Sequence, residues 1–311
     1  MRIFLAGGSG AVGRPLLSAL IELGHQVTVL TRSDATAGRL ERAGARAVVG
    51  DAFDRDAMIA AVEGSAPEVL IHQLTAIPAA IPPKKIALAL EPTNRLRTQG
   101  TANLIAGALR AGTRRIIAQS IAFAYAPGGE PIKGEDAPLY LDAPKEWVSV
   151  NLAIHAHEQQ IVTADMEGVV LRYGFFYGPG TQYAHDGFLA AEARKRRLPI
   201  VGTGTGVTSF IHVEDAAKAA VAMLGDAPPG TYNVVDDAPA TAREWIPVFC
   251  RAVGAPKPMR IPAVVARPIA GRYGVYVMTE LPGASNAKIK SETSWTPAYP
   301  TWRAALGTSD G

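Results

Sequence analysis

The sequence predicts an α/β protein with a doubly wound parallel sheet and a smaller, interleaved C-terminal capping region. Short apolar segments alternate with segments that carry apolar residues at helical spacing, from residue 2 to about residue 174. The apolar segments are nearly continuous, as in strands that are buried on both faces. A glycine-rich turn, FLAGGSGAVG (4–13), follows the first of them. Right-handed crossovers between such strands place helices on both faces of one sheet.

The expected elements follow this alternation along the chain. Strands are expected at residues 2–6, 25–32, 45–51, 68–74, 113–120 and 168–174. Helices are expected at residues 12–24, 39–44, 56–64 and 94–112, the first of them ending at Gly24. FIHVEDAAKAAVAML (210–224) repeats the strand-then-helix pattern, and TYNVVDD (231–237) predicts one more strand. These last two segments therefore return to the sheet after an interruption.

The composition changes where the alternation is interrupted. YGPGTQY (177–183) and VGTGTGVT (201–208) are rich in glycine, and an earlier insertion contains Pro127, Pro131, Pro138 and Pro144. Such segments are typical of loops at the rim of a site. We therefore expect one domain at residues 1–174, with returning segments at about 208–237, and a capping region at residues 175–311.

The glycine-rich turn predicts a dinucleotide site, because it lies between the first strand and the first helix. It matches both GxxGxxG (Gly7, Gly10, Gly13) and GxGxxG with Gly8 in first place. Early glycines make the tight turn, Gly10 lets the backbone approach a pyrophosphate, and Gly13 lets the helix pack on the strand. Free N–H groups at the helix N-terminus then bind the phosphates. The expected contacts come from Gly7, Ser9, Gly10, Ala11, Val12 and Gly13.

The end of the second strand predicts which dinucleotide is bound. An NAD site needs a carboxylate there for the ribose 2′-hydroxyl, but Thr31 occupies the position and Arg32 follows it. A guanidinium suits the 2′-phosphate of NADP, although an arginine at a strand end can also be merely solvated. The sequence therefore favours NADP over NAD.

Composition excludes several other classes of protein. Hydrophobic residues make up 48% of the chain and charged residues 19%, and the net charge of +3 is too small for a nucleic-acid-binding surface. Cys250 is the only cysteine, so no disulfide framework is expected. We find no secretory signal pattern and no run of eighteen apolar residues. We expect a soluble cytoplasmic protein with a small-molecule substrate, without membrane or nucleic-acid partners.

Several further segments carry a family resemblance. GDAFD (50–54), VLIHQLTA (69–76), RIIAQS (115–120), VVLRYGFFYGPG (169–180) and FIHVEDAAKAA (210–220) follow the turn in a characteristic order and spacing. With them, the chain resembles the extended short-chain dehydrogenases/reductases, which have a Rossmann fold, and most of all their epimerase/dehydratase-like members. The resemblance runs from Met1 to about Trp302.

The resemblance implies further cofactor contacts and, in many relatives, a homodimer formed through helices that flank the sheet. Asp51 and Ala52 would contact the adenine, and Leu74, Thr75 and Ala76 would line the nicotinamide ribose. Gln119, Ser120, Tyr173 and Gly174 would lie near the nicotinamide ring. Ordinary packing or turn formation is the alternative for Leu74, Tyr173 and Asp51.

The catalytic helix departs from the family pattern in VNLAIHAHE (150–158). The family carries Tyr-x-x-x-Lys with a glutamate four residues after the lysine. Glu158 fits that glutamate, which places Ile154 at the lysine position and Val150 at the tyrosine position. His155 and His157 point about 200° apart on a helix, so no metal site is expected. His157 either faces the cofactor or is a packing residue, and residues 141–165 contain no tyrosine.

Other residues are candidates to replace the missing pair. Ser120 ends the fifth strand and Tyr125 follows it, and both carry hydroxyls that could donate a proton. Lys133 or Arg97 could stabilise the anion of Tyr125. The alignment could instead place Ile121 at the serine position, and Tyr125 could be a packing residue. Tyr177 and Arg97 are the substrate candidates. Arg97 stands where relatives have asparagine and could bind a carboxylate or phosphate, or form a solvated helix face. RKRR (194–197) has the same two interpretations.

Two hypotheses follow from these residues. The first is an atypical NADP-dependent oxidoreductase or epimerase-like enzyme that acts on a small carbonyl or alcohol. The second is a non-catalytic NAD(P)-binding sensor or interaction protein, which the apolar pair Val150 and Ile154 motivates. The glycine-rich loops after Gly174 favour the enzyme, because they predict a substrate pocket.

Overall fold

The computed structural model describes residues 1–78, 81, 85–225 and 227–303, and its centre is one parallel sheet of seven strands. The strand order is β3-β2-β1-β4-β5-β7-β12. The strands are β1 (Arg2–Ala6), β2 (Gln26–Thr31), β3 (Arg46–Val49), β4 (Val69–His72), β5 (Arg115–Ile121), β7 (Glu167–Tyr173) and β12 (Gly230–Val234). This architecture confirms the predicted fold class. Each expected strand is present, and its ends differ from the expected ones by at most three residues.

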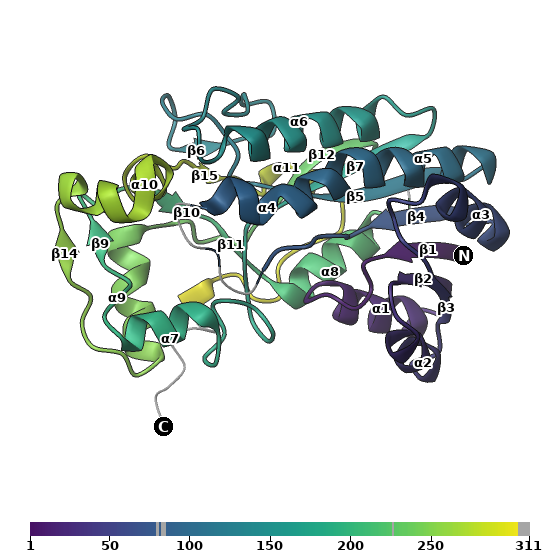
Figure 1. Cartoon of the computed structure of the whole chain (residues 1–311), viewed down its shortest axis with the longest axis horizontal. Helices are drawn as coiled ribbons and strands as arrows, with labels where there is room; N and C mark the ends of the chain where they lie inside the picture. Colours follow the sequence, from purple (N-terminus) through teal and green to yellow (C-terminus); the bar gives the residue numbers. More distant parts are fainter. Residues whose placement is uncertain (79–80, 82–84, 226, 304–311) are drawn as a thin grey trace.

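Helices cover both faces of the sheet (Figure 1). α1 (Gly13–Glu22) packs against α8 (Val213–Ala222) on one face, and α3 (Arg55–Ser65) packs against α5 (Thr101–Arg110) on the other. β1 shows why both faces need cover, since Ile3 and Leu5 pack in one core and Phe4 and Ala6 in another. Alternate side chains of a strand point to opposite faces, so an all-apolar strand requires two cores. α2 (Asp34–Arg42) follows β2.

The long helix after β4 differs from the sequence prediction. The expected helix at 94–112 is the second part of a run made of α4 (Ile86–Arg95), a π-helical turn η2 (Leu96–Gly100) and α5. Pro92 lies inside α4, where it has no N–H to donate to the preceding turn. Thr101, the first residue of α5, donates its hydroxyl to the carbonyl oxygen of Leu96 in the π-turn at 3.3 Å. Single π-turns of this kind occur often at functional sites.

The second region forms its own core beside the carboxyl ends of the strands. The remaining elements of the chain are β6 (Ile132–Lys133), α6 (Val148–Val162), β8 (Phe175–Tyr177), α7 (Phe188–Arg194), β9 (Ile200–Val201), β10 (Val207–Thr208), β11 (Phe210–His212), β13 (Ala240–Thr241), α9 (Ala242–Ala252), β14 (Arg260–Ile261), α10 (Ala263–Thr279), β15 (Gly283–Ala284) and α11 (Ala287–Glu292). Of these, α6 covers the sheet, while β9, β14, α7 and α9 form the opposite end of the molecule in Figure 1. Phe210, Trp245 and Phe249 are central to the cap core.

Two buried carboxylates attach the C-terminal segment to this frame. Asp215 at the start of α8 accepts the backbone N–H groups of Ala298 (3.0 Å) and Tyr299 (2.8 Å). Asp236, just after β12, accepts the N–H of Trp302 at 2.8 Å. Burial raises the pKa of Asp236 to about 7. The segment thereby links the sheet to the cap. No helix in the described ranges is both long and apolar enough to cross a bilayer.

A candidate coenzyme and substrate site

The glycine-rich turn lies where the strand order reverses, between β1 and β4. Ligands of open α/β sheets bind in the crevice outside the carboxyl ends of the strands at this switch point. A Cβ atom on Gly7 would lie 2.6 Å from the carbonyl carbon of Gln73, and one on Gly13 would lie 2.1 Å from the carbonyl oxygen of Gly7. These two glycines are therefore required by the fold. A Cβ atom on Gly10 would come no closer than 3.6 Å to its nearest protein neighbour, so Gly10 is not required for packing.

Unpaired amides gather at the same turn. The N-cap of α1 is Val12, whose side chain accepts no hydrogen bond, and the first turn holds no acidic residue. Within the described part of the chain, the N–H groups of Ala11, Val12 and Gly13 donate to no protein acceptor. Ser9 and Gly10 are exposed beside them. A helix N-terminus with free N–H groups binds anions, so these residues fit the pyrophosphate of a dinucleotide.

Arg32, the arginine predicted to bind the adenosine end of the coenzyme, directly follows β2. Thr31 is buried at the end of β2, whereas Arg32 is exposed and has no hydrogen bond or ion pair within the described residues. Asp51 after β3 uses Oδ1 to accept the N–H of Phe53 at 3.0 Å. Ala52 is buried, and its carbonyl accepts from the side chain of Asn103 at 2.9 Å. These two hydrogen bonds fix the turn that follows β3.

The residues predicted to line the nicotinamide lie at the ends of β4, β5 and β7. The side chain of Gln119 donates to the carbonyl of Leu74 at 3.1 Å, which ties the two strand ends together, and Thr75 is exposed beside them. Tyr173 is buried and donates to the carbonyl of Ala216 at 3.3 Å. Burial raises the pKa of Tyr173, so its phenol stays protonated. Its side chain therefore belongs to the core.

His157 belongs to a chain of hydrogen bonds that sequence reasoning missed. His72 Nε2 lies 3.1 Å from Thr101 Oγ1, which lies 2.8 Å from His157 Nδ1, and His157 Nε2 lies 2.9 Å from the carbonyl oxygen of Gln119. Burial lowers the pKa of His157 to about 4 and that of His72 well below its usual value, so both rings are neutral. The chain of bonds positions the ends of β4 and β5. The only signal of this chain of hydrogen bonds in the sequence is His72, a histidine at the end of an apolar strand.

The two candidate catalytic hydroxyls lie in a buried network. Ser120 donates to Glu158 at 2.6 Å, and Arg172 binds both oxygens of Glu158, at 2.9 and 2.7 Å. Tyr125 is fully buried, donates to Asn233 at 2.6 Å and accepts from Arg172 at 2.9 Å. Burial also raises the pKa of Tyr125. Both hydroxyls serve this network, and we do not propose either as the proton donor.

The substrate candidates have different surroundings. Tyr177 is fully buried among Phe210 and His212, with its hydroxyl 3.5 Å from the carbonyl oxygen of Tyr299, so it packs in the cap core and does not line the crevice. Arg97 is buried in η2, which excludes the solvated helix face, and it donates to Asn94 Oδ1 at 3.3 Å. Arg196 and Arg197 of the basic run are exposed.

Helix α6 is apolar at the two positions where the family carries its Tyr-x-x-x-Lys pair, as the sequence predicts. Val150 and Ile154 are fully buried on α6 and pack in one cluster with Leu90 of α4. Phe123, two residues after β5, and Phe175, two residues after β7, adjoin the same cluster. Their rings stack with centroids 4.1 Å apart, and both are half-buried. The sequence did not single out these two phenylalanines, because strand ends alone do not reveal which side chains meet.

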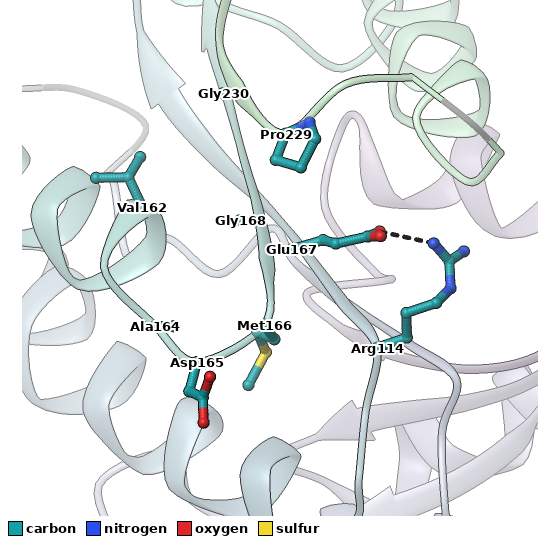
Figure 2. A pocket seen from close by; sticks show the side chains of 9 residues that line it. All are labelled: Arg114, Val162, Ala164, Asp165, Met166, Glu167, Gly168, Pro229 and Gly230. Carbon is teal, nitrogen blue, oxygen red and sulfur yellow. Dashed lines mark hydrogen bonds and ion pairs between the residues drawn. The ribbon is translucent and has the colours of Figure 1, made fainter.

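A separate hollow lies at the other end of the sheet (Figure 2). Glu167 begins β7, Gly230 begins β12, and Arg114 precedes β5, so the hollow opens at the amino ends of the strands. Glu167 pairs with Arg114 at 2.6 Å, as Figure 2 shows. The turn at Gly7–Gly13 follows the carboxyl end of β1, which excludes this hollow from the dinucleotide site.

The sheet order and the glycine-rich turn are those of a dinucleotide-binding Rossmann fold, and comparison with known proteins identifies the family. Residues 3–234 match the family model of the NAD dependent epimerase/dehydratase family, and the chain belongs to that family. The predicted family resemblance is thereby confirmed. The name of the family describes NAD-dependent epimerases and dehydratases, and reductases are among the proteins similar to this chain.

Among proteins similar in sequence is a Streptomyces protein named 3-diazoavenalumate denitrifying reductase. It is 44% identical over 310 residues, which cover 99% of each chain. A 2-alkyl-3-oxoalkanoate reductase from Stenotrophomonas maltophilia is 26% identical over 83% of this chain and 77% of its own. UDP-glucose 4-epimerase from Thermotoga maritima, solved with UDP-glucose, shares the fold with a TM-score of 0.75 at 19% identity, covering 99% of this chain and 96% of its own.

Proposed function

We propose that this protein is an NADP-dependent reductase that works without a Tyr-x-x-x-Lys pair. The observation that carries the proposal is the set of unpaired N–H groups at Ala11, Val12 and Gly13, with the unpaired guanidinium of Arg32 beyond the next strand. The amides would hold the pyrophosphate, and Arg32 would pair with the 2′-phosphate. When bound, the reduced coenzyme supplies a hydride to the substrate.

Among the described residues, the two hydroxyls that were candidates for the proton donor are held by buried partners, and this favours a substrate that needs no proton. Reduction of a carbonyl leaves an alkoxide, which a positioned acid must protonate. Val150 and Ile154 cannot do so, and Tyr125 and Ser120 already have buried partners. Replacement of a diazonium group by hydrogen is different. The C–N bond breaks, dinitrogen leaves with its electron pair, and the hydride forms the new C–H bond, so that one positive charge passes from substrate to coenzyme.

The similar Streptomyces protein supports this class of substrate, because its name describes the reductive removal of nitrogen from a diazo compound. We therefore propose an aryldiazonium compound as the substrate, in place of the small carbonyl or alcohol that the sequence predicted. The test is to mix the protein with NADPH and 4-methoxybenzenediazonium. We expect equal amounts of NADPH consumed and anisole formed, with deuterium transferred from C4-deuterated NADPH, and the heat-denatured protein as the control.

The other outcomes of this test are equally informative. Turnover of aldehydes or ketones without any of the diazonium salt would contradict the diazonium substrate and return the function to carbonyl reduction. NADPH binding without turnover of either class would contradict the reductase and favour the non-catalytic sensor, for which the buried apolar pair Val150 and Ile154 is the structural argument.

The choice of coenzyme gives a separate prediction. Arg32→Gln should weaken NADPH binding about 10- to 100-fold, because a hydrogen bond between charged groups contributes about 1.5–3 kcal/mol. NADH binding should change little, since NADH lacks the 2′-phosphate. Titration calorimetry measures both, and Arg39→Gln is the matched control, because Arg39 is also exposed but bonds Thr36 on α2. An equal loss for both coenzymes in Arg32→Gln would refute the proposed phosphate contact.

A further inference from the structure

Three arginine side chains are buried in the described part of the chain, and one of them lacks an acidic partner. Arg115 pairs with Glu167 at 2.7 Å, and Arg172 pairs with Glu158 at 2.7 Å. Arg97 is 8% exposed, and its only side-chain hydrogen bond goes to the neutral amide of Asn94. Within the described residues its Nε and Nη2 atoms have no partner.

An unpaired guanidinium in this position is costly. Glu158 lies near enough to influence Arg97, but both of its oxygens already bind Arg172. Burial lowers the pKa of Arg97 to about 10, so the side chain is still charged at neutral pH. A buried charge without a counter-ion destabilises the folded state. A ligand anion would supply the missing charge.

Hydrogen bonds place Arg97 close to the predicted crevice. Its partner Asn94 follows Thr93, whose hydroxyl accepts the N–H of Ala76 in the segment after β4 at 3.0 Å. The carbonyl of Arg97 lies 3.3 Å from the ring of His157 on α6. Arg97 thus lies between the end of β4 and the catalytic helix.

An aromatic surface adjoins the same helix. Phe123 and Phe175 form a stacked, half-buried pair against the apolar cluster that contains Val150 and Ile154. Aromatic rings prefer stacked or edge-to-face neighbours, so an incoming planar ring would extend this stack.

We propose that the site binds a planar aromatic acid, with its carboxylate on Arg97 and its ring against Phe123 and Phe175. This inference rests on the proposed function, since it specifies the substrate of the same crevice. It adds an anionic group that the diazonium chemistry does not require, and it assigns the aromatic ring to the two phenylalanines.

Binding of three probes tests the proposal without turnover. The probes are 2-naphthoate, its neutral analogue 2-naphthamide and the saturated acid cyclohexanecarboxylate, each titrated by calorimetry with and without NADP⁺. We expect 2-naphthoate to bind at least about 10-fold more tightly than either analogue. Equal binding of the naphthoate and the naphthamide would overturn the carboxylate contact. Equal binding of the two acids would overturn the aromatic contact. Coenzyme binding is titrated separately, so its failure would count against the proposed function alone.

Two variants assign the contacts to residues. Arg97→Met should remove the preference for the acid over the amide, and Phe123→Leu should remove only the preference for the aromatic acid over the saturated one. Arg97→Met should also raise the thermal midpoint of the ligand-free protein by about 2 °C or more, because it removes an uncompensated charge. Arg172→Met, which breaks a paired arginine, should lower that midpoint. If Arg97→Met instead lowers the midpoint and keeps the acid preference, Arg97 has a structural role and the proposal is overturned.

Discussion

Gly10→Ala is expected to weaken coenzyme binding by about 10-fold or more while the fold stays intact, whereas Gly13→Ala is expected to disrupt the fold. The same added methyl group meets different surroundings at the two positions. At Gly10 its nearest protein atom lies 3.6 Å away, an ordinary contact, and the residue is exposed to the crevice. At Gly13 it would lie 2.1 Å from the carbonyl oxygen of Gly7 and 2.8 Å from the backbone of Gly8.

Circular dichroism melting and calorimetric titration with NADPH measure the two effects. The expected pattern is an unchanged melting midpoint with poor binding for Gly10→Ala, and a strongly lowered midpoint for Gly13→Ala. Gly64→Ala is the control, since no atom lies within 4 Å of its added Cβ and it is far from the turn in sequence. Wild-type affinity in a well-folded Gly10→Ala would show that the pyrophosphate does not approach this turn.

Glu158→Ala should lower the free energy of unfolding by about 3–5 kcal/mol, because it leaves Arg172 buried without its counter-ion. Both residues are buried, and Ser120 would lose its acceptor at the same time. Urea denaturation measures the change. Glu192→Ala is the matched control, because Glu192 pairs with exposed Lys195 and surface pairs contribute only about 0–1 kcal/mol.

The variant Glu158→Gln separates the contribution of the charge from that of the hydrogen bond to Ser120. In Glu158→Gln the amide can still accept the hydrogen bond from Ser120, but the charge is lost. The free energy of unfolding should therefore lie between that of the alanine variant and that of the wild type. Similar unfolding midpoints for Glu158→Ala and Glu192→Ala would mean that the buried network does not stabilise this fold.

The sequence predicted the features that depend on local pattern. One continuous stretch of the chain contains strand β1, the turn at Gly7–Gly13 and Arg32 at the end of β2. Their spacing alone therefore predicts a dinucleotide site. The parallel sheet followed from the alternation of apolar and amphipathic segments. Even the resemblance to relatives was carried by short segments in a constant order.

The sequence could not predict which hydroxyls face the crevice, because burial depends on distant partners. Tyr125 is held by Arg172, 47 residues away, and by Asn233, 108 residues away. His157 binds Thr101, 56 residues before it. Phe123 and Phe175 meet only because β5 and β7 are neighbours in the sheet. Such pairings arise from tertiary structure, and no local periodicity indicates them.

The most direct test of this account is calorimetric titration of the unmodified protein with NADPH and, separately, with NADH. We predict one binding site per chain, with NADPH bound at least about 10-fold more tightly than NADH. If neither coenzyme gave a heat of binding, the result would contradict the proposal that the turn and Arg32 bind the coenzyme. It would also contradict the proposal that this chain is a reductase.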